Sequence, residues 1–282
     1  MAVRIITDSA SDIDDIDDPR LRVVPLSISF GDQTFKDGVD LDHARFYELL
    51  VEREELPTTG QVTPFEWQQA FEAALEGPED ELVCVTISSK LSGTNQSAVV
   101  AAEGFGGRVH VVDSLNACLG QRILVELALR LAAEGRDADQ IASELMRKRG
   151  DVRLVALLDT LEYLRRGGRI DAVSAGIGTM LQVKPVVAIR DGAVVTLGKA
   201  RGSKNGRNLL SEEVERSGGI DIGLPLAIGY SGPSDHLLRK YVEDSRWLWE
   251  GRLDEIPVHT VGSTVGTHVG PGGIALAYFS QA

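Results

Sequence analysis

The chain alternates short apolar segments with helical patterns, and several of the apolar segments end in the same way. Residues 3–7, 83–87 and 108–113 are rich in valine and isoleucine, as buried strands are. Each is followed or closed by small polar residues: Thr7-Asp8-Ser9, Ser88-Ser89 and Asp113-Ser114. Strands that alternate with helices indicate parallel βαβ units in a sheet covered on both faces. Because ligands bind at the carboxyl ends of such strands, we expect these polar side chains to share one crevice.

The segment 83–97, VCVTISSKLSGTNQS, reads as a strand, a hydroxyl-rich turn and a helix. We predict that Thr94 caps this helix, because its hydroxyl can accept a free N–H group of the first turn. The positive end of the helix dipole and the exposed N–H groups favour an anion at this place. An ordinary capped βα turn has the same pattern, so the segment alone leaves both interpretations open.

The second half of the chain adds a hairpin to this alternation. Residues 183–189 and 193–199 flank Asp191-Gly192, a pair that is typical of a tight hairpin turn. Helical patterns follow and alternate with further short strands, so we predict a mixed sheet here. Because this pattern differs from the regular alternation in the first half, we place a domain boundary near residues 150–153.

Composition limits the class of protein. The chain has 282 residues, of which 43% are hydrophobic and 25% charged, as is ordinary for a folded protein. The formal net charge of −13 argues against a nucleic-acid partner, since such binding needs basic residues. No apolar run reaches the roughly 20 residues of a membrane span, and we expect no signal peptide. Cys84 and Cys118 lie in apolar contexts and are expected to be free thiols of a cytoplasmic protein.

Familiar catalytic motifs are missing. Gly198-Lys199-Ala200 lacks the hydroxyl residue of a phosphate-binding loop. In the segment 262–266, threonine stands where a hydrolase elbow has its nucleophile. The five histidines and two cysteines do not have the spacing of a zinc site. We therefore expect no metal and no cofactor.

A histidine and several arginines remain as candidates. His268 lies in the glycine-rich segment 266–273, which we predict to be a tight loop before the last strand. Arg169 follows two glycines and could hold a carboxylate or a phosphate. A structural histidine and solvated surface arginines, Arg201 among them, are the simpler interpretations of these residues taken alone.

Taken together, these motifs resemble those of the DegV family of bacterial fatty-acid-binding proteins over essentially the whole chain. The matching segments are Thr7-Asp8-Ser9, Asp37-Gly38-Val39-Asp40, Pro57-Thr58-Thr59, Ser88-Ser89, Leu91-Ser92-Gly93-Thr94, Val112-Asp113-Ser114, residues 161–170, and His268 with Gly270-Pro271-Gly272. The resemblance implies an α/β fold of two domains. Residues 1–152 would form an α/β/α parallel-sheet (Rossmann-like) domain and residues 153–282 an α/β domain on a mixed sheet, with a fatty acid between them.

The resemblance also implies how the fatty acid is held. Its carboxylate would be bound by Thr59, Ser92 and His268, with Gly93 and Thr94 in supporting positions, and its acyl chain would lie in an apolar tunnel. The chain departs from the family's usual pattern at several positions, where the family commonly has other residues: Gly60, Val62, Lys90 and Asn95.

In function, the resemblance implies a lipid carrier rather than an enzyme. Such a protein presents a long-chain fatty acid such as palmitate to a separate ATP-dependent fatty acid kinase, which makes the acyl phosphate for phospholipid metabolism. We expect Arg169 and Arg201 to face this partner or the transferred phosphate, and transient contact with a membrane is compatible with the role. Two alternatives stay open: a hydrolase of acyl esters that uses Ser92 and His268, and a lipid sensor with another partner.

Overall fold

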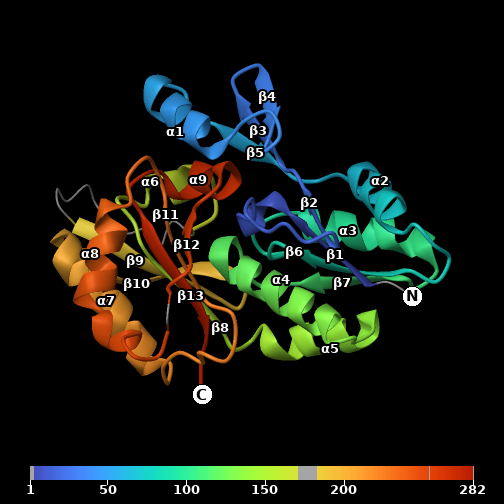
Figure 1. Ribbon diagram of the computed structural model, residues 1–282. Helices are drawn as coiled ribbons and strands as arrows, with labels where there is room; N and C mark the ends of the chain where they lie inside the picture. Colours follow the sequence, from blue (N-terminus) through green and yellow to red (C-terminus); the bar gives the residue numbers. More distant parts are fainter. Residues whose placement is uncertain (1–2, 171–182, 254, 282) are drawn as a thin grey trace.

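The structure, a computed structural model, describes residues 3–170, 183–253 and 255–281. Its strands form three sheets of four, six and three strands. In Figure 1 the four-stranded and six-stranded sheets stand side by side, and the three-stranded sheet lies above them.

The four-stranded sheet is entirely parallel, with the order β2-β1-β6-β7. Its strands are β1 (Val3–Asp8), β2 (Leu21–Val24), β6 (Glu81–Thr86) and β7 (Val109–Asp113). Its helices are α2 (Pro64–Ala74), α3 (Thr94–Ala102), α4 (Cys118–Ala133) and α5 (Ala138–Lys148). Figure 1 shows α2 and α3 on one side of the sheet and α4 and α5 on the other. The predicted parallel sheet with two covered faces is therefore confirmed.

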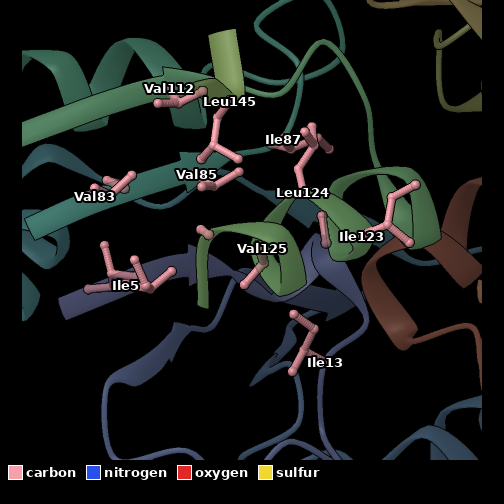
Figure 2. Close-up of a cluster of buried hydrophobic side chains, with 14 of the residues drawn as sticks. Ile5, Ile13, Val83, Val85, Ile87, Val112, Ile123, Leu124, Val125 and Leu145 are labelled. Carbon is pink, nitrogen blue, oxygen red and sulfur yellow. The ribbon is translucent and has the colours of Figure 1, made fainter. Parts of the chain in front are cut away.

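Burial on both faces explains why these strands are apolar along their whole length. Ile5, Val83 and Val85 are fully buried, and Figure 2 shows them in one cluster with Leu124 of α4 and Leu145 of α5. Such side chains leave the water only if helices close over both sides of the sheet, and their burial is a main source of stability.

The second sheet has six strands in the order β10-β9-β8-β13-β11-β12, and only the β11–β12 pair is parallel. Its strands are β8 (Val152–Leu157), β9 (Val183–Arg190), β10 (Ala193–Arg201), β11 (Ala227–Tyr230), β12 (Val258–Thr260) and β13 (Ile274–Phe279). Helices α7 (Gly202–Arg216) and α8 (His236–Asp244) pack on it. Asp191 and Gly192 have φ of 50° and 83°, as a tight hairpin turn requires. The mixed sheet and its hairpin are therefore as predicted.

A third, antiparallel sheet was not expected from the sequence. Its strands and companion helix are β3 (Ser27–Phe30), β4 (Gln33–Lys36), β5 (Thr58–Gly60) and α1 (His43–Glu52). The remaining short elements are η1 (Ser9–Ser11), η2 (Glu103–Phe105), η3 (Arg246–Leu248), α6 (Glu162–Arg166) and α9 (Ser263–Val269). Strand β5 pairs with β3 across some thirty intervening residues, with Thr59 opposite Ile28. The small sheet packs against α9 and so brings Thr59 to it.

The prediction of a glycine loop around His268 is wrong at its start, because residues 263–269 form the helix α9. Its first free N–H groups find distant partners: Gly262 donates to Asp12 Oδ1 at 3.0 Å, and Thr264 to Asp37 Oδ2 at 3.1 Å. These bonds satisfy a helix end that has no local cap. Gly266 allows the helix to lie close to α1, where a Cβ would stand 2.7 Å from Phe46.

The division into residues 1–152 and 153–282 stays a prediction. Strand β8, the first of the six-stranded sheet along the chain, begins at Val152, close to the proposed boundary. Helix α4, however, contacts strands of both larger sheets. In the described part of the chain, no helix combines the length and the apolar content that a membrane crossing requires.

Candidate functional site

A mostly apolar pocket lies where the three sheets meet. It contains about 930 Å³ of empty space, counting the part that opens to solvent. Strands of the six-stranded sheet supply one wall through Ala156, Ala188 and Ile274. Residues that follow the parallel strands, such as Leu26 and Ile87, supply another. A pocket of this size and lining suits a small, largely apolar ligand.

The polar residues at the ends of the parallel strands do not line this pocket, which corrects the prediction of a shared polar crevice. They bind the backbone instead. Asp8 accepts the N–H group of Ile87 at 2.8 Å, and Asp113 accepts that of Ser89 at 3.2 Å, so each carboxylate joins two neighbouring strand ends. Ser88 donates to the carbonyl of Gly192 in the hairpin turn at 2.7 Å. These side chains hold the edge of the sheet together, and their apolar neighbours face the pocket.

Two of the three predicted carboxylate ligands contact each other in the pocket wall. The hydroxyl of Thr59, in β5, lies 2.9 Å from Nε2 of His268, in α9. The two residues are 209 positions apart in the chain, and the packing of the small sheet on α9 joins them. Both line the pocket.

His268 is neutral near pH 7. Burial and, to a smaller extent, the nearby Arg169 lower the pKa of its imidazole from 6.5 to about 4. Nδ1 is buried and has no hydrogen-bond partner among the described residues. The imidazole therefore meets the pocket through Nε2 alone, as one neutral donor or acceptor.

Ser92 lies in the loop between β6 and α3, and it also lines the pocket. Its hydroxyl is 2.9 Å from that of Thr94. Thr94 is not the cap of α3: it is the first helical residue, and Gly93 is the cap. The buried hydroxyl of Thr94 instead accepts the N–H group of Val62 at 3.3 Å, which fixes the loop that follows β5. Thr94 and Gly93 thus lie beside Ser92 without lining the pocket.

The two predicted arginines are placed differently. Arg169 lines the pocket, donating from Nε to the carbonyl of Leu91 at 3.1 Å and from Nη1 to that of Gly167 at 2.6 Å. Arg201, the last residue of β10, is exposed and does not line the pocket. The structure therefore gathers Thr59, Ser92, Arg169 and His268 around one pocket and leaves Arg201 on the surface.

This arrangement suits binding better than acyl transfer. The hydroxyl of Ser92 contacts Thr94 rather than His268, and within the described segments no acidic group orients Nδ1 of His268. Nucleophilic catalysis by serine needs both contacts. The same hydroxyls and imidazole can instead donate to a carboxylate at the end of an apolar chain. Outside the gaps at 171–182 and at position 254, no three side chains of His, Cys, Asp or Glu could hold a metal ion together.

Sequence reasoning missed the lining of the pocket. Val187, Ala188 and Ile189 of β9 all face it or border it, yet they have the same residue types as buried strand residues elsewhere. No local signal separates a pocket wall from a core. Gly167 was noted only as part of a motif, although a Cβ there would lie 2.3 Å from Nδ1 of His268.

Comparison with known proteins relates the chain to one family. The family model described as "Uncharacterised protein, DegV family COG1307" matches residues 2–281. A DegV domain-containing protein of Deinococcus radiodurans is 35% identical over 98% of this chain and 98% of its own. A solved structure on fatty acid binding of a DegV family protein from Thermus thermophilus is 31% identical, with a TM-score of 0.87 over 99% of this chain and 100% of that one.

A second solved structure shares the fold. It is the Fatty Acid Kinase (Fak) B3 protein of Streptococcus pneumoniae, solved with linoleic acid. It covers 100% of both chains with a TM-score of 0.88 at 24% identity. The two-domain α/β architecture implied by the sequence motifs is therefore that of solved DegV structures.

Proposed function

This chain belongs to the DegV family, and from that premise we propose that it binds a long-chain fatty acid. The carboxylate lies against Thr59, Ser92 and His268, and the acyl chain fills the apolar pocket. The observation that carries the proposal is the pocket itself, where neutral hydrogen-bonding groups from three separate elements meet an otherwise largely apolar lining.

The energies of the carboxylate's hydrogen bonds and of the buried acyl chain agree with these two binding roles. A carboxylate that leaves water must have its oxygens satisfied, because an unpaired buried charge is very costly. Two hydroxyls and an imidazole N–H can satisfy it. Burial of the tail at roughly 0.8 kcal/mol per methylene gives about 11 kcal/mol for about fourteen methylenes, before ordering costs. The head group therefore sets orientation and the tail supplies most of the affinity.

Native mass spectrometry of the purified protein, followed by lipid extraction, tests the proposal directly. We expect a bound fatty acid or uptake of added palmitate. Thr59→Val, Ser92→Ala and His268→Ala should each weaken binding by about tenfold, the effect of one lost hydrogen bond. Thr58→Val is the matched control, because the neighbouring hydroxyl is exposed on the same strand. The proposal is refuted if the purified protein carries no fatty acid and takes up none of the added palmitate.

We further propose that the protein presents the fatty acid to a separate ATP-dependent kinase and has no catalysis of its own. The likeness to a protein named as part of a fatty acid kinase supports this partner. Arg201 is exposed and away from the pocket lining, so it is the better probe of the partner surface. Arg201→Ala should keep palmitate binding and lower acyl-phosphate formation by a bacterial fatty acid kinase. Equal loss of both, or loss of neither, would contradict this role for Arg201.

Arg169 requires a separate test, because it lines the pocket as well. Arg169→Ala should lower phosphorylation, and comparison of its palmitate affinity with that of the wild type separates a partner role from a binding role. Equal loss of both would place Arg169 in the binding site alone. Supplying the fatty acid from phospholipid vesicles in the same assay tests transient contact with a membrane.

The hydrolase alternative is tested by incubation with an acyl ester or thioester. We expect no turnover, whereas turnover that Ser92→Ala abolishes would favour an enzyme. If palmitate binds but no kinase uses the loaded protein, a lipid sensor in the same cytoplasmic location becomes the better interpretation.

A further inference from the structure

Helices α6 and α9 each end at a glycine that lies against an aromatic ring of the other helix. Gly167, after α6, lies against the imidazole of His268, where a Cβ would stand 2.3 Å from Nδ1. Gly270, after α9, lies against the ring of Tyr163, where a Cβ would stand 2.4 Å from two ring carbons. Real Cβ atoms essentially never approach another atom to within 3.0 Å. Both contacts therefore exist only because these positions lack side chains.

Space, and not backbone freedom, explains the glycine at 167. Gly167 has φ −72° and ψ −9°, a conformation that any residue adopts. Gly168 differs: its φ is +68°, and a Cβ there would meet nothing within 4 Å. The two adjacent positions therefore require glycine for different reasons: position 167 because His268 leaves no space for a side chain, and position 168 because of its positive φ.

The contact also bears on which nitrogen of His268 carries the proton. In glycine an α-hydrogen occupies the direction in which a Cβ would stand, so this hydrogen of Gly167 points at Nδ1. Nδ1 is buried and has no partner among the residues that the structure describes. A protonated Nδ1 would be a buried donor without an acceptor, which is unfavourable. An unprotonated Nδ1 receives the weak Cα–H contact, and the neutral ring then carries its proton on Nε2.

We propose that Gly167 is a positioning residue for the carboxylate site. Because its Cα carries no side chain, the imidazole of His268 can pack against it. This contact keeps the ring proton on Nε2, beside Thr59, where the fatty-acid carboxylate can accept a hydrogen bond from it. This inference rests on the proposed binding of a fatty acid.

The backbone of Gly167 connects the same residue to the other side of the site. Its carbonyl accepts Nη1 of Arg169 at 2.6 Å, and Nε of Arg169 donates to the carbonyl of Leu91 at 3.1 Å. Leu91 immediately precedes Ser92. Displacement of Gly167 would therefore disturb His268 directly and the Ser92 loop through Arg169.

A double-mutant cycle tests the proposal. Gly167→Ala should weaken palmitate binding by at least about tenfold, as expected for a misplaced donor. In a His268→Ala background the same substitution should have no further effect, because the ring that it displaces is gone. Gly150→Ala and Gly168→Ala are the controls, since neither new methyl group would have a neighbour within 4 Å. Gly150→Ala should keep wild-type affinity, whereas Gly168→Ala, at a positive φ, measures the effect of backbone strain beside Gly167 without the contact to His268.

Nitrogen-15 spectra of histidine-labelled protein give a readout that mere destabilisation does not change. The wild type should show an unprotonated Nδ1 and a protonated Nε2 at His268, and Gly167→Ala should alter this pattern. If Gly167→Ala folds poorly, recovery of its thermal midpoint in the double variant would support the contact, and failure to recover would oppose it.

Unchanged affinity and an unchanged tautomer in Gly167→Ala would overturn the proposal, as would equal losses in both backgrounds. If the wild type binds no palmitate, the proposed function fails, and the spectra and midpoints still decide the role of Gly167.

Discussion

Lowering the pH from about 7 to about 5 should destabilise the protein through the imidazole of His268. Burial, with a smaller contribution from Arg169, lowers the pKa of this group from 6.5 to about 4. Between these values the unfolded chain binds more protons than the native protein. The contribution of His268 is therefore complete above pH 6.5 and is lost as the pH falls through 4. The gap corresponds to about 3 kcal/mol, of which about 2 kcal/mol is lost by a pH of about 5.

Urea unfolding of the wild type and of His268→Gln, at a series of pH values, measures this contribution. The glutamine variant cannot take up the proton, so the difference between the two free energies of unfolding isolates His268. Burial raises the pKa of Asp8 to about 6 and that of Asp12 to about 8, which gives the opposite pH dependence. These groups are present in both proteins and cancel in the difference. Parallel pH profiles of the two proteins would refute the reasoning.

Two further predictions concern residues near the same pocket. Burial raises the pKa of Asp12 to about 8, so the native protein loses stability as the pH rises through this value. Asp12→Asn should therefore lose about 1 kcal/mol less than the wild type between pH values of about 7 and 9 in urea unfolding, and an equal loss would contradict the assignment. Ala188 lines the pocket, and Ala188→Phe should fill part of it. Each methylene then excluded costs about 0.8 kcal/mol, so affinities measured from decanoate to stearate should shift toward shorter acids, and an unchanged preference would place the acyl chain elsewhere.

Where burial or capping is local, the pattern of residues is sufficient to predict structure. The strand at 83–87 was recognisable because a parallel sheet buries both faces, so every position must be apolar. Thr63 with Glu66, and Asp137 with Gln140, form the capping boxes that begin α2 and α5. Such bonds close within four residues, and their residue types are visible in the sequence.

Predictions failed where a residue's partner is remote. Thr94 has the right hydroxyl and position for a cap, but its hydroxyl faces Val62 and Ser92 instead. Helix α9 begins without a local cap because Asp12 and Asp37 accept its first N–H groups. The pairing of β5 with β3 is equally invisible in either segment alone.

The same distinction between local patterns and remote partners holds for the candidate site. The sequence by itself determined the alternation of strands and helices and the hairpin. Through motifs shared with a family, it also indicated Thr59, Ser92 and His268 as candidate ligands. Only the tertiary structure decided that Thr59 meets His268, that Arg201 stands apart, and that Gly167 must lack a side chain. Local patterns record what a residue needs, namely burial, a cap or a turn. Which distant atom meets that need depends on how the sheets and helices pack, and no short segment contains that information.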